Sequence, residues 1–266
     1  MGGLHYTIHL GTVHDERIGM PFNASRHGVR GSARQWNVDL MPGRVRVLEC
    51  AMPEDTPGDM PPLLNSVART FSLGVKAFGA HHKALAWHDA ERMQRRFDIF
   101  AGLIMDIPED RPISVNDHGC GYGAMFDSFR TLRALRHGRY YGYDISPEMI
   151  AEARKRIRDP RAEFFVSHVA ENEADYSFVS GTWNMKMWAT DAEWRDFVYE
   201  NLRDLWSQTR VALGFNMLSI DNPYREETLY YADPAHMLDF CRRELTVNVR
   251  TVDRLEPREF IVFLLR

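Results

Sequence analysis

One stretch decides how this chain folds, and it reads Ile113-Ser114-Val115-Asn116-Asp117-His118-Gly119-Cys120-Gly121-Tyr122-Gly123. Residues 113–117 predict a short strand, and residues 124–136, directly after the glycines, predict a helix. Between a strand and a helix, glycines let a ligand approach the backbone and permit dihedral angles that a Cβ would penalise. The stretch therefore predicts a ligand-binding loop in preference to a plain tight turn.

Strands and helices alternate on both sides of this loop. An amphipathic helix is expected at residues 89–107, where apolar residues recur at three- and four-residue steps. Further strands are expected at residues 140–144, 162–167, 176–181, 211–218, 247–251 and 260–265, and helices at residues 147–158, 191–209 and 234–244. This alternation predicts an α/β fold with a Rossmann-like, doubly wound, mostly parallel sheet. The last two strands have no helix between them, which predicts an antiparallel C-terminal strand.

The first 62 residues differ in composition from the rest of the chain. Four prolines and three acidic residues fall within residues 52–62, a composition typical of a linker. Before it, short strands at residues 8–10 and 45–48 and a loosely ordered extension are alternative interpretations. We expect residues 1–62 to form an N-terminal extension with a Pro-rich linker, in part disordered, and residues 63–266 to form one domain.

Composition argues against several classes of protein. A net charge of −4 lacks the positive excess of a dedicated nucleic-acid binder, so nucleic acid is not an expected partner. The apolar uncharged stretches at residues 176–185 and 211–220 have about half the length that a membrane helix needs. The three cysteines have no paired spacing and no secretory signal is visible, so a cytoplasmic protein is expected. No metal site is expected, because no cluster of His, Cys and acidic residues has metal-ligand spacing.

The spacing of the glycines narrows the class of ligand. The dinucleotide fingerprint G-x-G-x-x-G is not met, because the third glycine, Gly123, comes one residue early. The Gly-Lys-[Ser/Thr] ending of a nucleoside triphosphate loop is also missing. Asp144 ends the second strand, 21 residues beyond Gly123, where an acid can accept hydrogen bonds from both ribose hydroxyls of a nucleoside. An acid that only caps the next helix is the alternative, but Ser146 already suits that role.

Two motifs resemble those of class I S-adenosylmethionine-dependent methyltransferases. Residues 117–123 are similar to the first motif of that family, and residues 141–150, which read Tyr-Gly-Tyr-Asp-Ile-Ser-Pro-Glu-Met-Ile, are similar to the second. The resemblance implies S-adenosylmethionine as cofactor and S-adenosylhomocysteine as product. It also implies that the first loop holds the methionine part of the cofactor, that Asp144 holds the ribose, and that Ile145 and Met149 pack against the adenine. The loop residues concerned are Asp117, Gly119, Cys120, Gly121 and Gly123.

A narrower resemblance, to a bacterial subgroup of this family, covers residues 87–265. It adds Trp87 and Arg96, which we expect to line the site and meet the methionine carboxylate, with a core Trp and a solvated Arg as alternatives. His168 and Val169 follow the third strand, where many relatives have an acid that reaches the adenine amine. Ser180, after the fourth strand, completes the expected cofactor contacts.

The methyl acceptor is expected beside the cofactor, outside the carboxyl ends of the strands. Residues 180–184 and 219–231 follow strands there, and Asn184, Tyr224 and Tyr231 are candidate substrate contacts. No catalytic residue is assigned. The expected reaction is methyl transfer to an O, N or C nucleophile of a small molecule or biosynthetic intermediate. The alternatives are an RNA or protein methyltransferase, a non-catalytic cofactor-binding protein and, less favoured by the glycine spacing, a nicotinamide oxidoreductase.

Overall fold

The computed structural model describes residues 38–41, 44–47, 60–85, 89–252 and 258–266. The chain divides into two compact units, Met1–Glu54 and Asp55–Arg266. In the first, β1 (Val38–Met41) and β2 (Arg44–Val47) pair as antiparallel strands. The strand expected at residues 45–48 overlaps β2, whereas the one expected at residues 8–10 and the contact expected of Trp87 lie outside the described residues.

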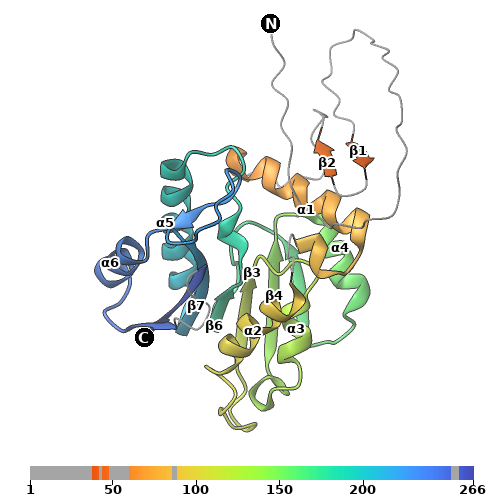
Figure 1. Ribbon diagram of the computed structural model, residues 1–266. Coiled ribbons are helices and arrows are strands. Elements are labelled where there is room, and N and C mark those ends of the chain that lie inside the picture. Colours follow the sequence, from red (N-terminus) through yellow and green to blue (C-terminus); the bar gives the residue numbers. More distant parts are fainter. Residues whose placement is uncertain (1–37, 42–43, 48–59, 86–88, 253–257) are drawn as a thin grey trace, which may run out of the picture. The chain divides into compact units, whose positions relative to one another are not determined.

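The second unit is built around an eight-stranded sheet (Figure 1) with strand order β5-β4-β3-β6-β7-β10-β9 and with β8 beside β7. The strands are β3 (Ser114–His118), β4 (Arg139–Asp144), β5 (Ala162–Val166), β6 (Ala174–Val179), β7 (Thr209–Ser219), β8 (Tyr231–Ala232), β9 (Val249–Val252) and β10 (Glu259–Leu265). All neighbours are parallel except β10, which lies antiparallel between β7 and β9. The predicted fold, including its antiparallel C-terminal strand, is confirmed.

The helices are α1 (Asn65–Phe78), α2 (Ala90–Ala101), α3 (Ala124–Phe129), α4 (Pro147–Arg156), α5 (Asp191–Ser207) and α6 (Pro234–Glu244), with short 3-10 turns at η1 (Pro62–Leu64), η2 (His82–Leu85), η3 (Arg133–Leu135) and η4 (Thr182–Asn184). Four of the α-helices begin after a capping residue whose side chain accepts a backbone N–H bond. The capping residues are Asp89, Ser146, Thr190 and Asp233. The helix expected at residues 124–136 is shorter, because Leu132 has an extended backbone with ψ of 136°. The helix expected at residues 89–107 ends at Ala101, with Gly102 as its C-cap.

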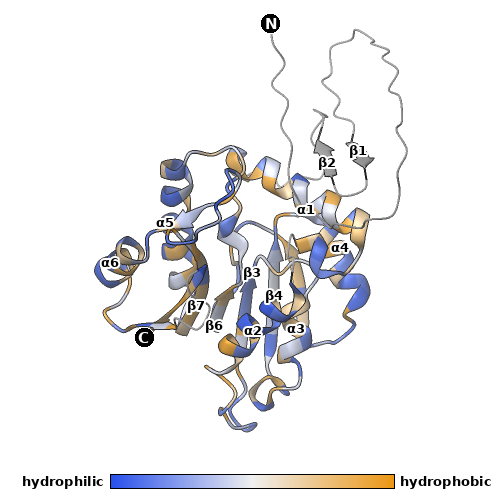
Figure 2. Ribbon diagram, viewed as in Figure 1, coloured by the Kyte–Doolittle hydropathy of each residue, from blue (hydrophilic) through white to orange (hydrophobic). Residues whose placement is uncertain are grey.

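The direction of the crossovers places the helices in two layers. From β3 the chain steps through α3 and α4 toward one edge, and from β6 it steps through α5 toward the other. Because crossovers between parallel strands are right-handed, the two sets cover opposite faces. Apolar side chains from α2, α3 and α4 form one core cluster with the inner strands, centred on Phe100, Phe129 and Phe178. In Figure 2, α5 and α6 carry both polar and apolar colours, as expected for helices with one buried face.

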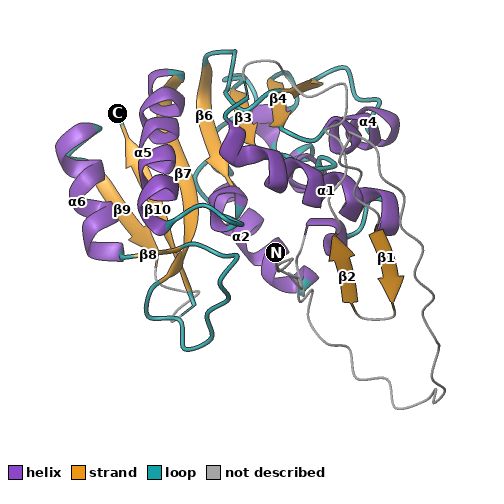
Figure 3. Cartoon of the chain, turned by 90° about the horizontal axis from the view of Figure 1, so that it is seen from above, coloured by secondary structure: helices purple, strands orange, loops and turns teal. Residues whose placement is uncertain are grey.

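Helix α1 was not expected from the sequence, and it lies beside α4 (Figure 3). The Ser72 and Ser146 hydroxyls are 2.9 Å apart, and the Lys76 ammonium is 2.7 Å from the Glu148 carboxylate. Ser146 is the N-cap of α4, so α1 is fastened next to the end of β4. Among the described residues, none of the helices has the length and apolar character that a membrane crossing requires.

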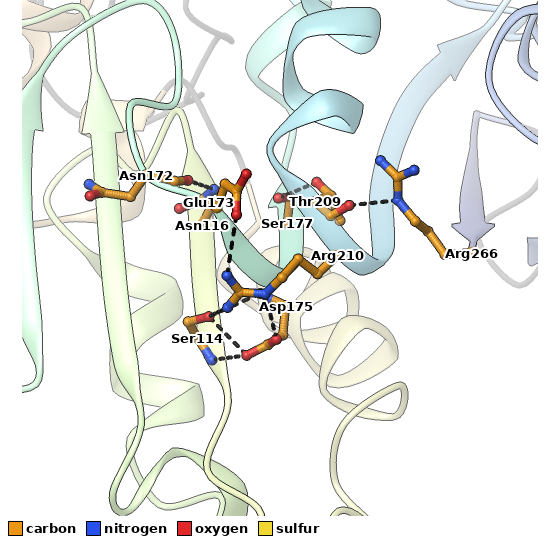
Figure 4. Close-up of polar contacts among 9 residues, drawn as sticks. All are labelled: Ser114, Asn116, Asn172, Glu173, Asp175, Ser177, Thr209, Arg210 and Arg266. Atoms are coloured by element: carbon orange, nitrogen blue, oxygen red, sulfur yellow. Dashed lines mark hydrogen bonds and ion pairs between the residues drawn. The ribbon is translucent and has the colours of Figure 1, made fainter.

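A polar cluster joins the amino ends of β3, β6 and β7 (Figure 4). The Asp175 carboxylate accepts bonds from the Ser114 backbone N–H at 2.7 Å, the Ser114 hydroxyl at 2.9 Å and Arg210 Nε at 3.1 Å. Burial alone would raise the pKa of Asp175, but the bonds from Arg210 and Ser114 outweigh it and lower that pKa. These contacts therefore hold the amino ends of the strands together, and the loops at the opposite, carboxyl edge of the sheet are available to form a site.

Candidate active site

The glycine loop after β3 is held against the end of β4 by three backbone N–H groups. Gly119 and Cys120 both donate to the Tyr143 carbonyl, at 2.8 and 2.9 Å. Gly121 donates to Oδ2 of Asp144 at 2.9 Å. The two predicted motifs therefore meet at the carboxyl edge of the sheet, as their positions in the sequence indicated.

Two of the loop glycines cannot be replaced without displacing neighbouring segments. Gly119 has φ of +80°, and a Cβ there would lie 2.0 Å from Oγ1 of Thr182 in the segment after β6. Gly121 has φ of +54°, and a Cβ there would lie 2.4 Å from Cδ2 of Leu85. Both conditions, positive φ and close approach, require glycine. The loop thus brings together segments from three distant parts of the chain.

Asp144 is a buried carboxylate with remaining capacity for hydrogen bonds. Only 8% of the residue is exposed, and its Oδ1 accepts the Ser146 N–H at 2.9 Å while Oδ2 accepts that of Gly121. Burial raises the pKa of Asp144 to about 6, against the opposing effect of these N–H bonds. At neutral pH the group is mostly ionised, and each oxygen keeps a further lone pair that can accept a ligand hydroxyl.

Asp117, the first residue of the glycine motif, is hydrogen-bonded to another residue inside the core. Its carboxylate accepts the hydroxyl of Tyr140, and both residues are buried. Burial raises the pKa of Asp117 to about 7 and raises that of the neighbouring Cys120 thiol well above its usual value. We assign both side chains to the support of the loop, because neither is among the residues that line the pocket described next.

A pocket with about 720 Å³ of empty space opens beside Asp144. It is formed by the loops after β3, β4, β5 and β6, together with α1, α5 and the η2 segment. Its lining residues are Leu64, Val67, Phe71, Leu85, His118, Gly119, Asp144, Ile145, Ser167, His168, Ser180, Gly181, Thr182, Trp183, Trp194 and Phe197. The carboxyl edge of the sheet and two helices thus line one pocket, part of which is open to solvent.

Several of the predicted cofactor residues line this pocket, and others do not. Gly119, Asp144, Ile145, His168 and Ser180 line it. Gly121 and Gly123 shape the same loop, each with positive φ. Asp117, Cys120, Met149 and Val169 are not among the lining residues. The side chain of Met149 is fully buried, and its N–H donates to the Ser146 hydroxyl.

The position of Arg96 differs from the expectation. The guanidinium is fully buried, its Nη1 lies 2.9 Å from both carboxylate oxygens of Glu259 on β10, and it does not line the pocket. Burial lowers the pKa of Arg96, while the adjacent Glu259 carboxylate opposes that shift. Arg96 is thus neither a solvated side chain nor a pocket residue, because a core carboxylate already neutralises its charge.

The three candidate substrate residues do not line the pocket. Asn184 is buried, and its Oδ1 accepts the Leu218 N–H at 3.0 Å. Tyr224 is 73% exposed, and the Tyr231 hydroxyl is bonded to the backbone of residues 224 and 226. Of the two segments expected to meet an acceptor, residues 180–183 line the pocket, whereas no residue of 219–231 does.

Sequence reasoning missed the aromatic and helical walls of the pocket. Trp194 and Phe197 come from the buried face of α5, and Leu64, Val67 and Phe71 come from α1 and the turn before it. The apolar residues of α1 recur at steps of three and four, so the helix itself could have been predicted. Nothing in its sequence indicates which cavity it covers.

Comparisons with known proteins agree with this geometry. A family model described as "Methyltransferase domain" matches residues 115–205. The "Putative methyltransferase Rv1506c" of Mycobacterium tuberculosis is 34% identical over 156 residues, which cover 58% of this chain and 93% of that protein. The solved 1,6-didemethyltoxoflavin-N1-methyltransferase of Burkholderia thailandensis has a TM-score of 0.52 and 18% identity, covering 80% of this chain and 93% of that one. Its structure contains 1,6-didemethyltoxoflavin and S-adenosylhomocysteine.

Fold, site and relatives together define an enzyme that transfers methyl groups. The chain belongs to the class I S-adenosylmethionine-dependent methyltransferases. Its cofactor is S-adenosylmethionine and its product S-adenosylhomocysteine. The residues present fit that cofactor, because the glycine cradle admits no Cβ and a buried carboxylate with free lone pairs stands beside it.

Proposed function

We propose that this enzyme methylates an O, N or C nucleophile of a small molecule or biosynthetic intermediate in the cytoplasm. The observation that carries the proposal is the pocket beside Asp144, where the loops at the carboxyl edge of the sheet meet α1 and α5 and supply mostly apolar walls with a few polar groups. Helices α1 and α5 contribute walls to it, which suits a compact ligand better than a polymer. The Burkholderia thailandensis enzyme, which shares the fold, holds a small-molecule ligand.

Within the pocket we propose a specific arrangement for the cofactor. Asp144 accepts hydrogen bonds from the ribose hydroxyls, Ile145 packs against the adenine, and His168 lies at the adenine side. The backbone of residues 119–123 holds the methionine part, with Ser180 opposite. When bound, S-adenosylmethionine supplies a methyl group activated by a positively charged sulfur.

The protein's own contribution is then mainly positional. The walls of the pocket hold the acceptor in one orientation and exclude water, which converts an encounter of two molecules into a reaction within one complex. A general base is required only for an acceptor that carries a proton on the attacking atom.

The cofactor assignment is tested by calorimetric titration with S-adenosylhomocysteine and, in parallel, with NAD. We expect micromolar binding of S-adenosylhomocysteine only. Asp144→Ala should weaken it by about 1.5–3 kcal/mol, the range for a hydrogen bond to a charged group. Asp196→Ala, an exposed carboxylate on α5, is the matched control and should bind normally. Equal affinity in Asp144→Ala and wild type would refute the ribose assignment.

The acceptor class is tested with cofactor labelled in its methyl group. The enzyme is incubated with a lysate, which is then separated into small molecules, protein and RNA. Label in the small-molecule fraction, and its loss in a Gly119→Val control, is the expected result. Label confined to RNA or protein would show that the acceptor is a macromolecule.

A further inference from the structure

Three buried polar atoms of the pocket-lining residues have no hydrogen-bond partner within the described part of the chain. They are Nδ1 of His118, Oγ of Ser180 and Nε1 of Trp183. Buried polar groups in native proteins are almost always paired, so each such group needs an explanation. All three residues line one pocket, where a bound ligand could supply the missing partners.

His118 occupies the last position of β3, directly before the first glycine of the loop. Its backbone carbonyl accepts the Thr182 hydroxyl at 2.9 Å, which fixes the residue against the segment after β6. Burial and then the charge of nearby His168 lower the pKa of His118 to about 4, so the imidazole is neutral at physiological pH. A neutral imidazole offers one donor and one acceptor, the pair that a hydroxyl or a ring nitrogen can use.

Trp183 is held rigidly beside this imidazole. Only 1% of it is exposed, its ring centroid is 5.8 Å from that of His118, and its carbonyl accepts the Trp194 indole N–H at 2.7 Å. Its own indole N–H is a donor without an acceptor. The polar groups of His118 and Trp183 therefore lie on neighbouring rings of one wall.

Apolar side chains form much of the remaining lining, together with polar residues such as Asp144 and His168 that we assign to the cofactor. Trp194 and Phe197 of α5 are in contact with each other, with ring centroids 5.1 Å apart. Val67 and Phe71 of α1 line the same pocket. Flat aromatic walls bury a flat ring most completely, and isolated polar groups among them fix its orientation.

We propose that His118 and Trp183 determine acceptor specificity by hydrogen bonding to a hydroxyl or ring-nitrogen group on the edge of a flat, mostly apolar acceptor. This inference rests on the proposed small-molecule function and specifies its substrate class. Ser180, assigned to the cofactor, lies at the boundary between the two ligands. His118 and Trp183 are specificity-determining residues, and the transfer itself needs no covalent step on either.

The experiment compares two probes of equal shape, 2-naphthol and 2-methylnaphthalene, by equilibrium dialysis against protein saturated with S-adenosylhomocysteine. We expect 2-naphthol to bind about tenfold more tightly, because only its hydroxyl can use the two polar groups. In His118→Phe and in Trp183→Phe the ratio should fall toward one. His118→Asn, which retains a polar group near Nδ1, should keep part of it.

Two controls separate this inference from the proposed function. His236→Phe, at an exposed histidine of α6, should leave the probe ratio unchanged. The affinity for S-adenosylhomocysteine should stay within about twofold in all variants, which shows that they fold. A wild-type ratio near one, failure of both probes to bind, or an undiminished ratio in both phenylalanine variants would overturn the inference. The proposed small-molecule function is tested independently: labelled methyl groups found only in RNA or protein would refute it.

Discussion

Asp144 has two tasks in this structure. It accepts the N–H groups of Gly121 and Ser146, and so joins the glycine loop to the start of α4. It also lines the pocket, where its remaining lone pairs are available to a ligand. Because both tasks need the ionised form, the raised pKa of about 6 makes this residue sensitive to mild acid.

Cofactor affinity should therefore fall in mild acid. Protonation removes the negative charge and part of the acceptor capacity, so S-adenosylhomocysteine should bind progressively more weakly as the pH drops through about 6. The affinity is measured by calorimetry between pH 8 and pH 5. In Asp144→Asn, which cannot ionise, it should be low throughout and nearly independent of pH.

Other titratable groups near Asp144 make distinguishable contributions. The pKa of His118 is lowered to about 4, so this group stays neutral over the tested range. Asp117 has a pKa near 7 but faces Tyr140 instead of the pocket. His168 lines the pocket, and His168→Gln should retain the acid sensitivity. A pH profile in Asp144→Asn as steep as in wild type would assign the effect to another group.

Residues within the two motifs could be predicted because their roles are set locally. The spacing from Gly123 to Asp144 reflects one crossover of fixed size, so the pairing of loop and acid follows from the sequence. The partners of His118 and Arg96 could not be predicted in this way, because Trp183 and Glu259 come from distant segments of the chain. Only the structure shows that His118 lines a pocket and that the side chain of Arg96 meets a carboxylate.

At the level of elements, one buried network joins helix α2 to the sheet and to the pocket. Glu259 of β10 accepts bonds from Arg96 of α2 at 2.9 Å and from Asn216 of β7 at 3.0 Å. Oδ1 of Asn216 accepts the N–H of Gly181, a pocket residue, at 2.7 Å. Helix α2 is thus connected through three side chains to the wall of the site.

Glu259→Gln should destabilise the fold strongly. The change leaves the buried Arg96 charge without its counter-ion, and removing one partner of a buried pair typically costs about 3–5 kcal/mol. Urea unfolding followed by circular dichroism measures the free energy of unfolding. Glu244→Gln, in an exposed pair with Arg203, is the matched control and should change it by less than about 1 kcal/mol. A similar loss of unfolding free energy in both variants would show that the buried ion pair contributes no more to stability than the exposed one.

Element boundaries followed the sequence where a cap marked them. Helix α6 begins after Asp233 and ends at Glu244, as predicted, because Asp233 accepts the N–H groups of Ala235 and His236. Helix α1 has no side-chain cap, and its amphipathic spacing was the only available signal. Its cover over the site depends on Ser72 and Lys76 meeting α4, contacts between elements that no local pattern indicates.

At the level of the whole molecule, the pocket belongs to the second of the two compact units. Among the residues that the structure describes, those that line it lie at position 64 or beyond. We therefore propose that the residues before Met60 are an appendage to the catalytic domain, as the composition of residues 1–62 indicates.

Deletion of residues 1–59 should leave the affinity for S-adenosylhomocysteine within about twofold of that of the full chain. Met60 is retained because it is buried in the second unit. Calorimetry on both proteins gives the comparison, and circular dichroism confirms that the shortened chain is folded. A folded variant that no longer binds would make the segment a working part of the site.

The position of β10 between β7 and β9 has a consequence for how the sheet grows. Strand β9 precedes β10 in the sequence, yet its only described neighbour in the sheet is β10. During synthesis β9 therefore leaves the ribosome before β10, the strand with which it pairs, and it can join the sheet only after β10 has been made. The carboxylate that neutralises Arg96 also lies on β10, so this edge of the sheet and the buried ion pair depend on the same strand.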